Sequence, residues 1–178
     1  IPVLFPICGN LPDDRFEVDG LDYTLPQHGF ARDLPWQLQL LDDQSGVRLS
    51  LSSSADTLKA YPFPFLVEMA LRPVADALEI TTTILNRGNR PMPFSFGLHP
   101  YFEVSDLGQA RLTGLPQRCL NHLAMADAAT ADQLADLSQG VDFLCRPAGP
   151  VTLIDESNGQ RLQLQHQEPL DLTVVWTE

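Results

Sequence analysis

The sequence predicts an all-β fold, a sandwich or a barrel with mostly antiparallel strands. Most of the 178 residues belong to short runs that alternate apolar and polar side chains or are rich in β-branched residues. Turns rich in glycine and proline separate these runs, and residues 130–137 alone suggest a helix. Many short strands with almost no helix between them are typical of all-β architectures.

The composition excludes several kinds of partner. The net charge of -12 argues against nucleic acid and anionic membrane surfaces, because both attract basic patches. No apolar run reaches the length that spans a membrane. Cys8, Cys119 and Cys145 are widely spaced and lack a CxxC motif, so we expect reduced thiols rather than a disulfide framework or a zinc cluster. These features predict a cytoplasmic protein, and we expect a monomer or weak dimer.

The first part of the chain combines a strand-like run with turns and a long loop. Residues 1–6 are hydrophobic and strand-like, and residues 8–14 are rich in turn formers. Val18-Asp19-Gly20 has the composition of a tight turn. Residues 25–36 fit neither a helical nor a strand period, so they predict a loop, which holds His28, Gly29, Phe30, Arg32 and Trp36.

From residue 36 onward the pattern predicts one strand after another. Alternation or β-rich composition predicts strands at 36–40, 47–51, 66–72 and 78–85. A turn at 43–46 separates the first two. Residues 61–65 are irregular, because their prolines block ladder hydrogen bonds. Residues 86–90 have turn composition, and we expect them to close a hairpin.

The last third of the chain contains a hairpin signal and the one expected helix. Asn158-Gly159 lies between strand-like runs at 151–154 and 162–164, which predicts a two-residue hairpin turn. Thr130 is expected to cap the helix at 130–137. No repeat or linker is visible, so we expect a single domain over residues 1–178. Because strand-like runs stand at both ends, we also expect this domain to be incomplete at both ends.

Residues 94–102 combine four aromatic side chains with one glycine, one histidine and one proline. Phe94, Phe96 and Leu98 have the alternation of a half-buried strand. His99 ends this strand, because the next residue is a proline, which offers no N–H. Gly97 leaves space for another group to come close. A histidine within aromatic walls suits a sugar, since flat apolar faces cover its C–H side and a titratable group reaches its oxygens.

His28, Arg32 and His99 are the candidate site residues. Because the pKa of imidazole is near neutral, one histidine can donate a proton to a ring oxygen while the other holds a hydroxyl. The guanidinium of Arg32 offers a fork of donors for hydroxyls or a phosphate. Each residue also has a structural interpretation: His28 can satisfy the loop backbone, and Arg32 can pair with Asp33.

Four segments resemble the aldose 1-epimerase (galactose mutarotase) superfamily, namely residues 1–10, 28–32, 61–65 and 96–102. They are most similar to the branch that includes glucose-6-phosphate 1-epimerases. The pairing of His-Gly-Phe-Ala-Arg with Gly-Leu-His-Pro-Tyr-Phe is specific to this superfamily. The resemblance implies a galactose-mutarotase-like β-sandwich, or supersandwich. It also implies that His28 and His99 are catalytic and that Arg32 lies at the substrate.

The implied reaction interconverts the α and β anomers of a hexose or hexose-6-phosphate. A carboxylate removes the proton of the C1 hydroxyl while His99 protonates the ring oxygen. The ring opens, the C1–C2 bond rotates, and closure on the other face reverses the roles. Acid and base groups suffice for these steps, so we expect no cofactor and no metal. The alternatives are a non-catalytic carbohydrate-binding β-sandwich and a module whose aromatic residues only form a core.

The resemblance further implies charged residues that the chain does not supply at the matching positions. The base is a glutamate after the strand matching 172–176, and Glu178 is not expected to be that residue. An arginine is expected just before the segment that matches 1–5. An aspartate that binds a sugar hydroxyl is expected near Gly114 and the residues that follow. There we expect Asn121 to bind a hydroxyl, with Tyr101 as a second substrate-binding residue; Asp142 is a weaker candidate, expected in a solvated turn.

Overall fold

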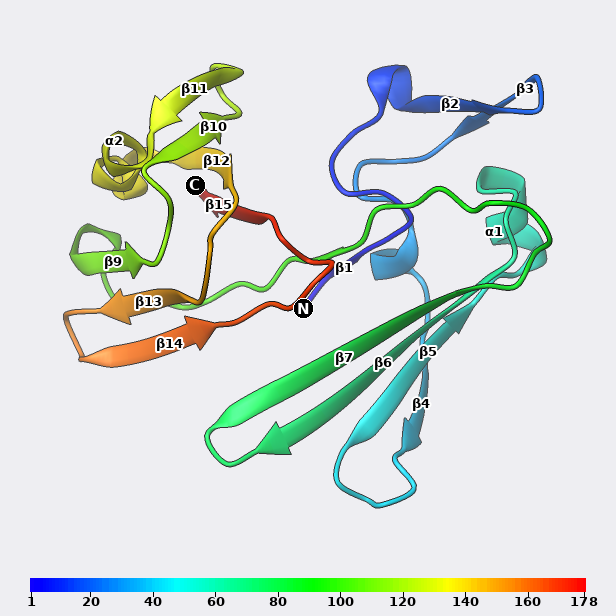
Figure 1. The fold of residues 1–178 in the computed structure, drawn as a ribbon, viewed down its shortest axis with the longest axis horizontal. Coiled ribbons are helices and arrows are strands. Elements are labelled where there is room, and N and C mark those ends of the chain that lie inside the picture. Colours follow the sequence, from blue (N-terminus) through cyan, green and yellow to red (C-terminus); the bar gives the residue numbers. More distant parts are fainter. The chain divides into compact units, whose positions relative to one another are not determined.

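The computed structural model describes residues 1–178, which are mostly strand (Figure 1). Every strand pair is antiparallel, and the one parallel contact is an isolated bridge between Phe5 and Gly29. The predicted all-β, mostly antiparallel fold is therefore confirmed. The chain forms two compact units, Ile1–Tyr101 and Phe102–Glu178. The single domain expected over 1–178 stays a prediction. None of the helices is long and apolar enough to cross a membrane.

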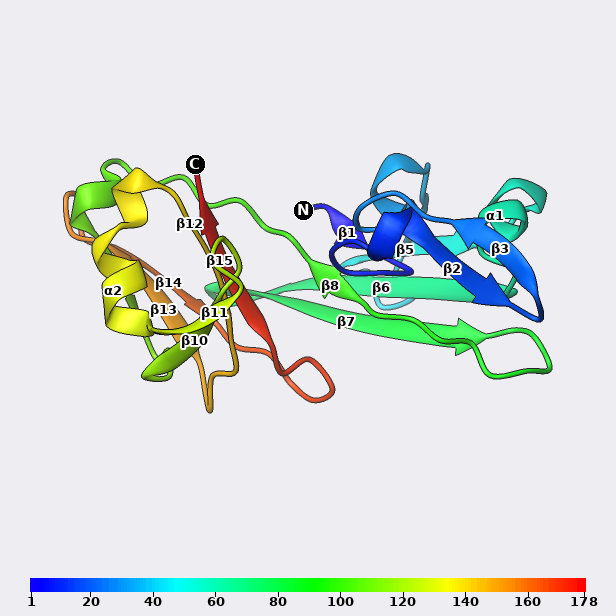
Figure 2. The same cartoon turned by 90° about the horizontal axis from the view of Figure 1, so that it is seen from above.

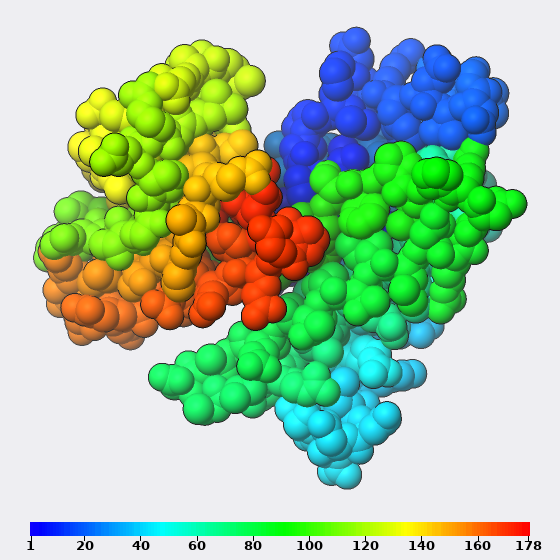
Figure 3. All heavy atoms as spheres, in the orientation of Figure 1, coloured from blue at the N-terminus to red at the C-terminus, as the bar shows by residue number.

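The main sheet of the first unit is a meander in the order β4-β5-β6-β7. Its strands are β4 (Gln37–Leu40), β5 (Val47–Ser52), β6 (Phe65–Val74) and β7 (Ala77–Asn86). Leu51, Val67 and Met69 share one face and are buried, because alternate residues of a strand point the same way. The hairpins extend beyond this core (Figures 1 and 3), and Leu38 and Leu40 on β4 are exposed.

Two short antiparallel pairs complete the strands of the first unit. β1 (Val3–Leu4) pairs with β8 (Gly97–Leu98), and β2 (Arg15–Val18) pairs with β3 (Leu21–Thr24), as Figure 2 shows. The predicted tight turn joins β2 to β3 through Asp19 and Gly20, whose φ angles are 53° and 79°. Two positive φ angles are the geometry that Asp-Gly favours in two-residue hairpins. The predicted loop at 25–36 is confirmed, with one short 3-10 turn, η2 (Ala31–Asp33).

Aromatic rings fill the core of the first unit. Phe5 and Phe65 are fully buried, with ring centroids 5.0 Å apart. Tyr61 is also buried and donates its hydroxyl to the carbonyl of Pro93 at 2.7 Å. This burial raises the pKa of the Tyr61 phenol. The irregular residues 61–65 are therefore part of the core rather than part of a surface loop.

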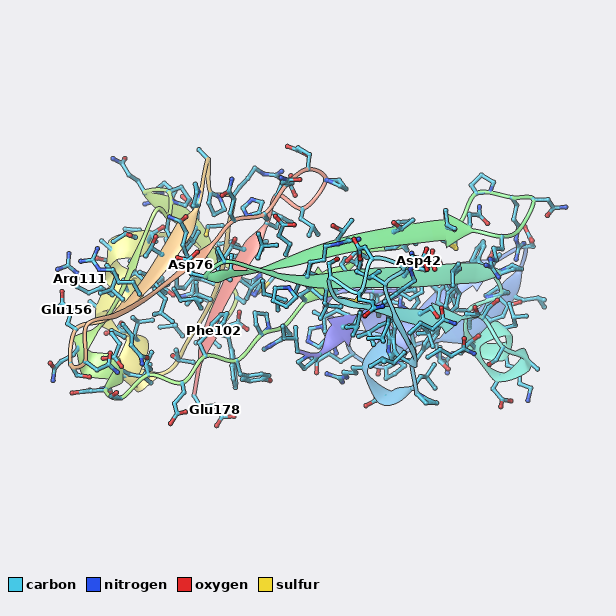
Figure 4. All side chains as sticks on the ribbon, turned by 90° about the horizontal axis from the view of Figure 1, so that it is seen from below. Asp42, Asp76, Phe102, Arg111, Glu156 and Glu178 are labelled. Atoms are coloured by element: carbon cyan, nitrogen blue, oxygen red, sulfur yellow. The ribbon has the colours of Figure 1, made fainter.

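The second unit contains two sheets, in the orders β11-β10-β12-β15 and β14-β13-β9. The strands are β9 (Ala110–Thr113), β10 (Arg118–Asn121), β11 (Ala126–Ala129), β12 (Val141–Cys145), β13 (Val151–Asp155), β14 (Gln160–Leu164) and β15 (Thr173–Thr177). Phe143 is fully buried and shares its core cluster with Cys119 and Cys145. Arg111 and Glu156, labelled in Figure 4, form an ion pair of 2.9 Å beside the second sheet.

A buried carboxylate fixes the turn between β13 and β14. Asp155 accepts hydrogen bonds from the backbone N–H groups of Ser105 at 2.8 Å and Ser157 at 3.1 Å. It also accepts from the Asn158 amide at 3.0 Å. The bond from Ser105 is the main reason why the pKa of Asp155 is held down to about 2. The predicted hairpin is confirmed, although its turn covers four residues, 156–159, rather than two.

Two predictions in the first unit, one strand and one hairpin turn, are wrong. The strand expected at 94–98 shrinks to the two residues of β8. The Ser95 N–H donates to the Pro6 carbonyl at 2.9 Å, but Pro6 carries no N–H to donate in return, so the apolar alternation before β8 does not produce a strand. Residues 86–90 do not close a hairpin either. β7 pairs instead with β6 across a turn at Ala75-Asp76, and β8 pairs with β1.

Both helices differ in detail from the expectation. α2 (Thr130–Ala135) is the expected helix, but its N-cap is Ala129. The Thr130 hydroxyl is buried without a hydrogen-bond partner. α1 (Ala55–Ala60) is not predicted by the sequence pattern, because six residues show too little of a helical period. Its start is fixed by reciprocal bonds between Ser54 and Thr57, at 2.8 Å and 3.2 Å.

Candidate active site

His28 is fixed in its loop by two hydrogen bonds to Gly9. Its backbone N–H donates to the Gly9 carbonyl at 2.8 Å, and its Nδ1 accepts from the Gly9 N–H at 2.9 Å. The φ angle of His28 is 66°, a left-handed conformation that is rare outside glycine. The structural interpretation of His28 is therefore correct for Nδ1, which satisfies the loop backbone. Nε2 is the other nitrogen, and it takes no part in these bonds.

The bond from Gly9 sets the protonation state of His28. Because Nδ1 accepts a hydrogen bond, the neutral ring carries its proton on Nε2. Burial lowers the pKa of His28, and the positive charge of Arg32 and of protonated His99 lowers it further. His28 is thus neutral near pH 7 and presents an Nε2–H donor.

The glycine after His28 allows the loop to lie directly against β1. Gly29 has a φ angle of 71°, and a Cβ at this position would lie 2.3 Å from the Phe5 carbonyl oxygen. The same carbonyl accepts from the backbone N–H groups of Phe30 and Ala31, both at 3.1 Å. Since Phe5 is fully buried, this contact ties the histidine loop to the core.

His99 lies beside His28 although 71 positions separate them in the sequence. β8 runs antiparallel to β1, and the backbone N–H of His99 donates to the Pro2 carbonyl at 3.0 Å. The ring centroids of His28 and His99 are 6.1 Å apart, with an interplanar angle of 75°. Tyr101 stacks on His99 at 4.8 Å and 26°, and it is 68% exposed. The two histidines and the tyrosine therefore form one cluster.

The space beside Gly97 is taken by the chain itself. A Cβ at Gly97 would meet the sulfur of Cys8 at 3.0 Å and a Leu4 carbon at 3.5 Å. The backbone N–H of Cys8 donates to the Ser95 hydroxyl at 2.7 Å. Gly97 thus allows the segment with Cys8 to pack closely, and it does not leave room for a further group.

The charge of Arg32 acts on His28, although Arg32 also has partners within its own loop. Its Nη2 donates to the Gln27 carbonyl at 3.1 Å, and its Nε lies 3.6 Å from the Asp33 carboxylate. The side chain remains 35% exposed. It borders an open depression of about 190 Å³ lined by Ile1, Pro2, Val3, Arg32, Trp36 and Leu49. A charged fork at an open depression can meet an anionic group of a ligand.

In the second unit, Asn121 and Asp142 have different surroundings. The side-chain oxygen of Asn121 accepts from the Ala124 N–H at 3.1 Å, which fixes the turn after β10. Asp142 lies within β12, so the expectation that it occupies a solvated turn is wrong. Its Oδ1 is 2.8 Å from Nδ1 of His122, and the two side chains are 30% and 31% exposed. Sequence reasoning did not find this pair.

The comparisons with known proteins define the class. The model of the aldose 1-epimerase family matches residues 2–178, so the chain belongs to this family. This finding confirms the resemblance stated from the sequence motifs. The chain also matches solved structures of galactose mutarotase-like proteins, so its antiparallel β fold is galactose-mutarotase-like.

Particular relatives point to one branch of the family. A protein of Cenchrus ciliaris named "Putative glucose-6-phosphate 1-epimerase" is 36% identical over 124 residues, which cover 62% of this chain and 35% of that protein. A protein of the same name from Escherichia coli is 29% identical over 157 residues, which cover 85% of this chain and 51% of that protein. The chain therefore spans about a third to a half of these relatives.

A solved structure has the same fold along nearly the whole chain. The Slr1438 protein from Synechocystis sp. PCC 6803 is 34% identical, with a TM-score of 0.91, over 99% of this chain and 62% of that chain. A galactose mutarotase related enzyme from Lactobacillus acidophilus has a TM-score of 0.78 at 21% identity, which supports the fold alone.

Proposed function

We propose that the protein is an aldose 1-epimerase, an isomerase that interconverts the α and β anomers of a hexose or hexose-6-phosphate. The observation that carries the proposal is the pair of His28 and His99, whose ring centroids are 6.1 Å apart and whose environments differ. Family membership supports the class of reaction. The names of two relatives support a phosphorylated hexose as the substrate. The three widely spaced cysteines, which predict reduced thiols, favour a location in the cytoplasm.

His99 is the acid in this proposal. His28 is less suited to be the acid, because its Nδ1 accepts from Gly9 and its pKa, lowered by burial and by Arg32, leaves the ring neutral near pH 7. His99 protonates the ring oxygen as the C1–O bond breaks, while a carboxylate takes the proton of the C1 hydroxyl. The open aldehyde rotates about C1–C2 and closes on its other face. The base is the glutamate that the family resemblance implies, and no residue of this chain is assigned to it.

The other residues of the cluster bind and orient the sugar. The Nε2–H of His28 donates to a sugar oxygen, because neutral imidazole with an accepting Nδ1 has one donor left. Tyr101 offers an exposed aromatic face to the C–H side of the ring. Arg32 binds the 6-phosphate, since its guanidinium has donors in the planar arrangement that phosphate accepts.

In the second unit, Asp142 fits the aspartate of the family better than Asn121 does. The oxygen of Asn121 is occupied by the Ala124 N–H. Asp142 keeps a carboxylate within a strand, fixed by one bond to His122. We therefore assign the hydroxyl-binding role to Asp142, while the expected role of Asn121 is limited to shaping its turn.

Anomer exchange in solution tests this function. Exchange spectroscopy by NMR measures the interconversion of the two anomers of glucose-6-phosphate, glucose and galactose with and without the protein, expressed with its native termini. The proposal predicts faster exchange, most of all for the phosphorylated sugar. If the protein binds a sugar without accelerating exchange, it is the non-catalytic carbohydrate-binding protein of the alternative hypothesis.

A further inference from the structure

The mechanism described so far gives His122 no role of its own. The backbone N–H of His122 donates to the Asp142 carbonyl at 2.9 Å, which continues the β10–β12 ladder by one step. Nδ1 of the same histidine lies 2.8 Å from Oδ1 of the same aspartate. Two bonds, one through the backbone and one through the side chains, thus join this histidine to this carboxylate.

The chemistry of the pair fixes which group donates. An ionised carboxylate only accepts hydrogen bonds, so Nδ1 of His122 carries the proton of this bond. The bond occupies Oδ1 of Asp142, and Oδ2 is then the oxygen that can accept from a hydroxyl. A carboxylate fixed through one oxygen loses less side-chain freedom when the other oxygen binds a ligand.

An aromatic side chain stands next to this carboxylate. Trp176 on β15 is the register partner of Asp142 on β12, so both side chains point to the same face of the sheet. Trp176 is 42% exposed. An exposed indole beside an acceptor is the combination that carbohydrate recognition uses: a flat apolar face for C–H groups and a polar group for hydroxyls.

We propose that His122 is a positioning residue, which holds the Asp142 carboxylate in the orientation that binds a sugar hydroxyl. This inference rests on the proposed function, in which Asp142 takes the role of the family aspartate. The bond from His122 acts on binding in the ground state and in the transition state alike. Its loss therefore raises KM and leaves kcat nearly unchanged.

Two substitutions separate positioning from a structural role. His122→Phe keeps a flat ring and removes the donor, and we expect KM to rise about tenfold, the size of one hydrogen bond to a charged group. His122→Asn restores a donor close to the position of Nδ1, so KM should return to within about threefold of wild type. His166→Phe is the matched control, at a histidine outside both the His28–His99 cluster and the His122–Asp142 pair. If His122 were merely structural, its loss would lower the fraction of folded protein and therefore kcat, and KM would not rise on its own.

The outcomes distinguish this inference from the function on which it rests. An unchanged KM in folded His122→Phe, or no recovery in His122→Asn, overturns the positioning role and leaves the epimerase proposal intact. If wild type does not exchange anomers, the proposed function is wrong. In that case the dissociation constant for glucose-6-phosphate, measured by NMR titration, tests the positioning role of His122. Equal dissociation constants in wild type and His122→Phe overturn that role, and so does the absence of any binding.

Discussion

Replacement of Gly29 by alanine should destabilise the protein far more than the same replacement at Gly20. Both residues have positive φ angles, 71° and 79°, so alanine at either position meets the penalty of the left-handed region, about 1–2 kcal/mol. At Gly20 a Cβ has nothing within 4 Å, so no further cost is expected. At Gly29 the Cβ would lie 2.3 Å from the Phe5 carbonyl oxygen and 2.7 Å from a carbon of Pro6.

The Phe5 carbonyl cannot move away without losing two hydrogen bonds and disturbing a buried ring. Forcing an extra carbon into a packed site costs about 1–3 kcal/mol more. The total for Gly29→Ala is then about 2–5 kcal/mol, from the sum of these two terms. Because the loop that carries His28 must shift, anomer exchange should also slow.

Chemical denaturation of the two variants measures this difference. Gly20→Ala is the matched control, because it shares the residue change, the sign of φ and the same compact unit. We expect its free energy of unfolding to fall by about 1–2 kcal/mol, and that of Gly29→Ala to fall by clearly more. Equal losses in the two variants would refute the close contact between the histidine loop and β1.

Three further predictions follow from the charges on the described residues. Arg32→Ala should reduce turnover of glucose-6-phosphate far more than that of glucose, and added salt should weaken binding of the phosphorylated sugar. Arg15→Ala is the control. Equal losses on both sugars would assign Arg32 to a ring hydroxyl. NMR titration should find the pKa of His28 below its usual value, with Nε2 protonated, and Arg32→Ala should raise that pKa; an Nδ1–H tautomer would contradict the bond from Gly9. Asp155 has a folded pKa of about 2, below its ordinary value near 3.9, so its contribution to stability is complete above about pH 4 and is lost as the pH falls through 2. Asp155→Asn should lower stability at neutral pH and flatten this acid dependence in denaturation experiments, and an unchanged acid dependence would remove Asp155 from the account.

The strands of the main sheet could be predicted because their periodicity is local. The run from Val47 alternates apolar and polar residues, and the structure places its apolar set on the buried face. The same reasoning failed at 94–98. There the alternation is present, but Pro6, which accepts from Ser95, has no N–H to donate in return, and β1 offers pairing only to Gly97 and Leu98. A pattern of side chains does not by itself show whether the backbone has a partner.

The candidate site was only partly accessible from the sequence. The two motifs led to His28 and His99, but the bond that fixes the tautomer of His28 comes from the backbone of Gly9, which leaves no signal in the residue types. His122 and Asp142 are 20 positions apart, and their contact depends on the register of β10 against β12. One signal was present: residues 141–145 are an apolar run interrupted only by Asp142, which is typical of a strand and argues against a turn there.

The rate of anomer exchange in His99→Asn tests the central claim most directly. The measurement uses glucose-6-phosphate and the protein with its native termini. His166→Asn is the control, at a histidine outside both the His28–His99 cluster and the His122–Asp142 pair. If His99 protonates the ring oxygen, the exchange rate should fall roughly a hundredfold or more in a folded protein, the usual size of a general-acid contribution. A folded His99→Asn variant that exchanges anomers as fast as wild type would remove His99 from the mechanism.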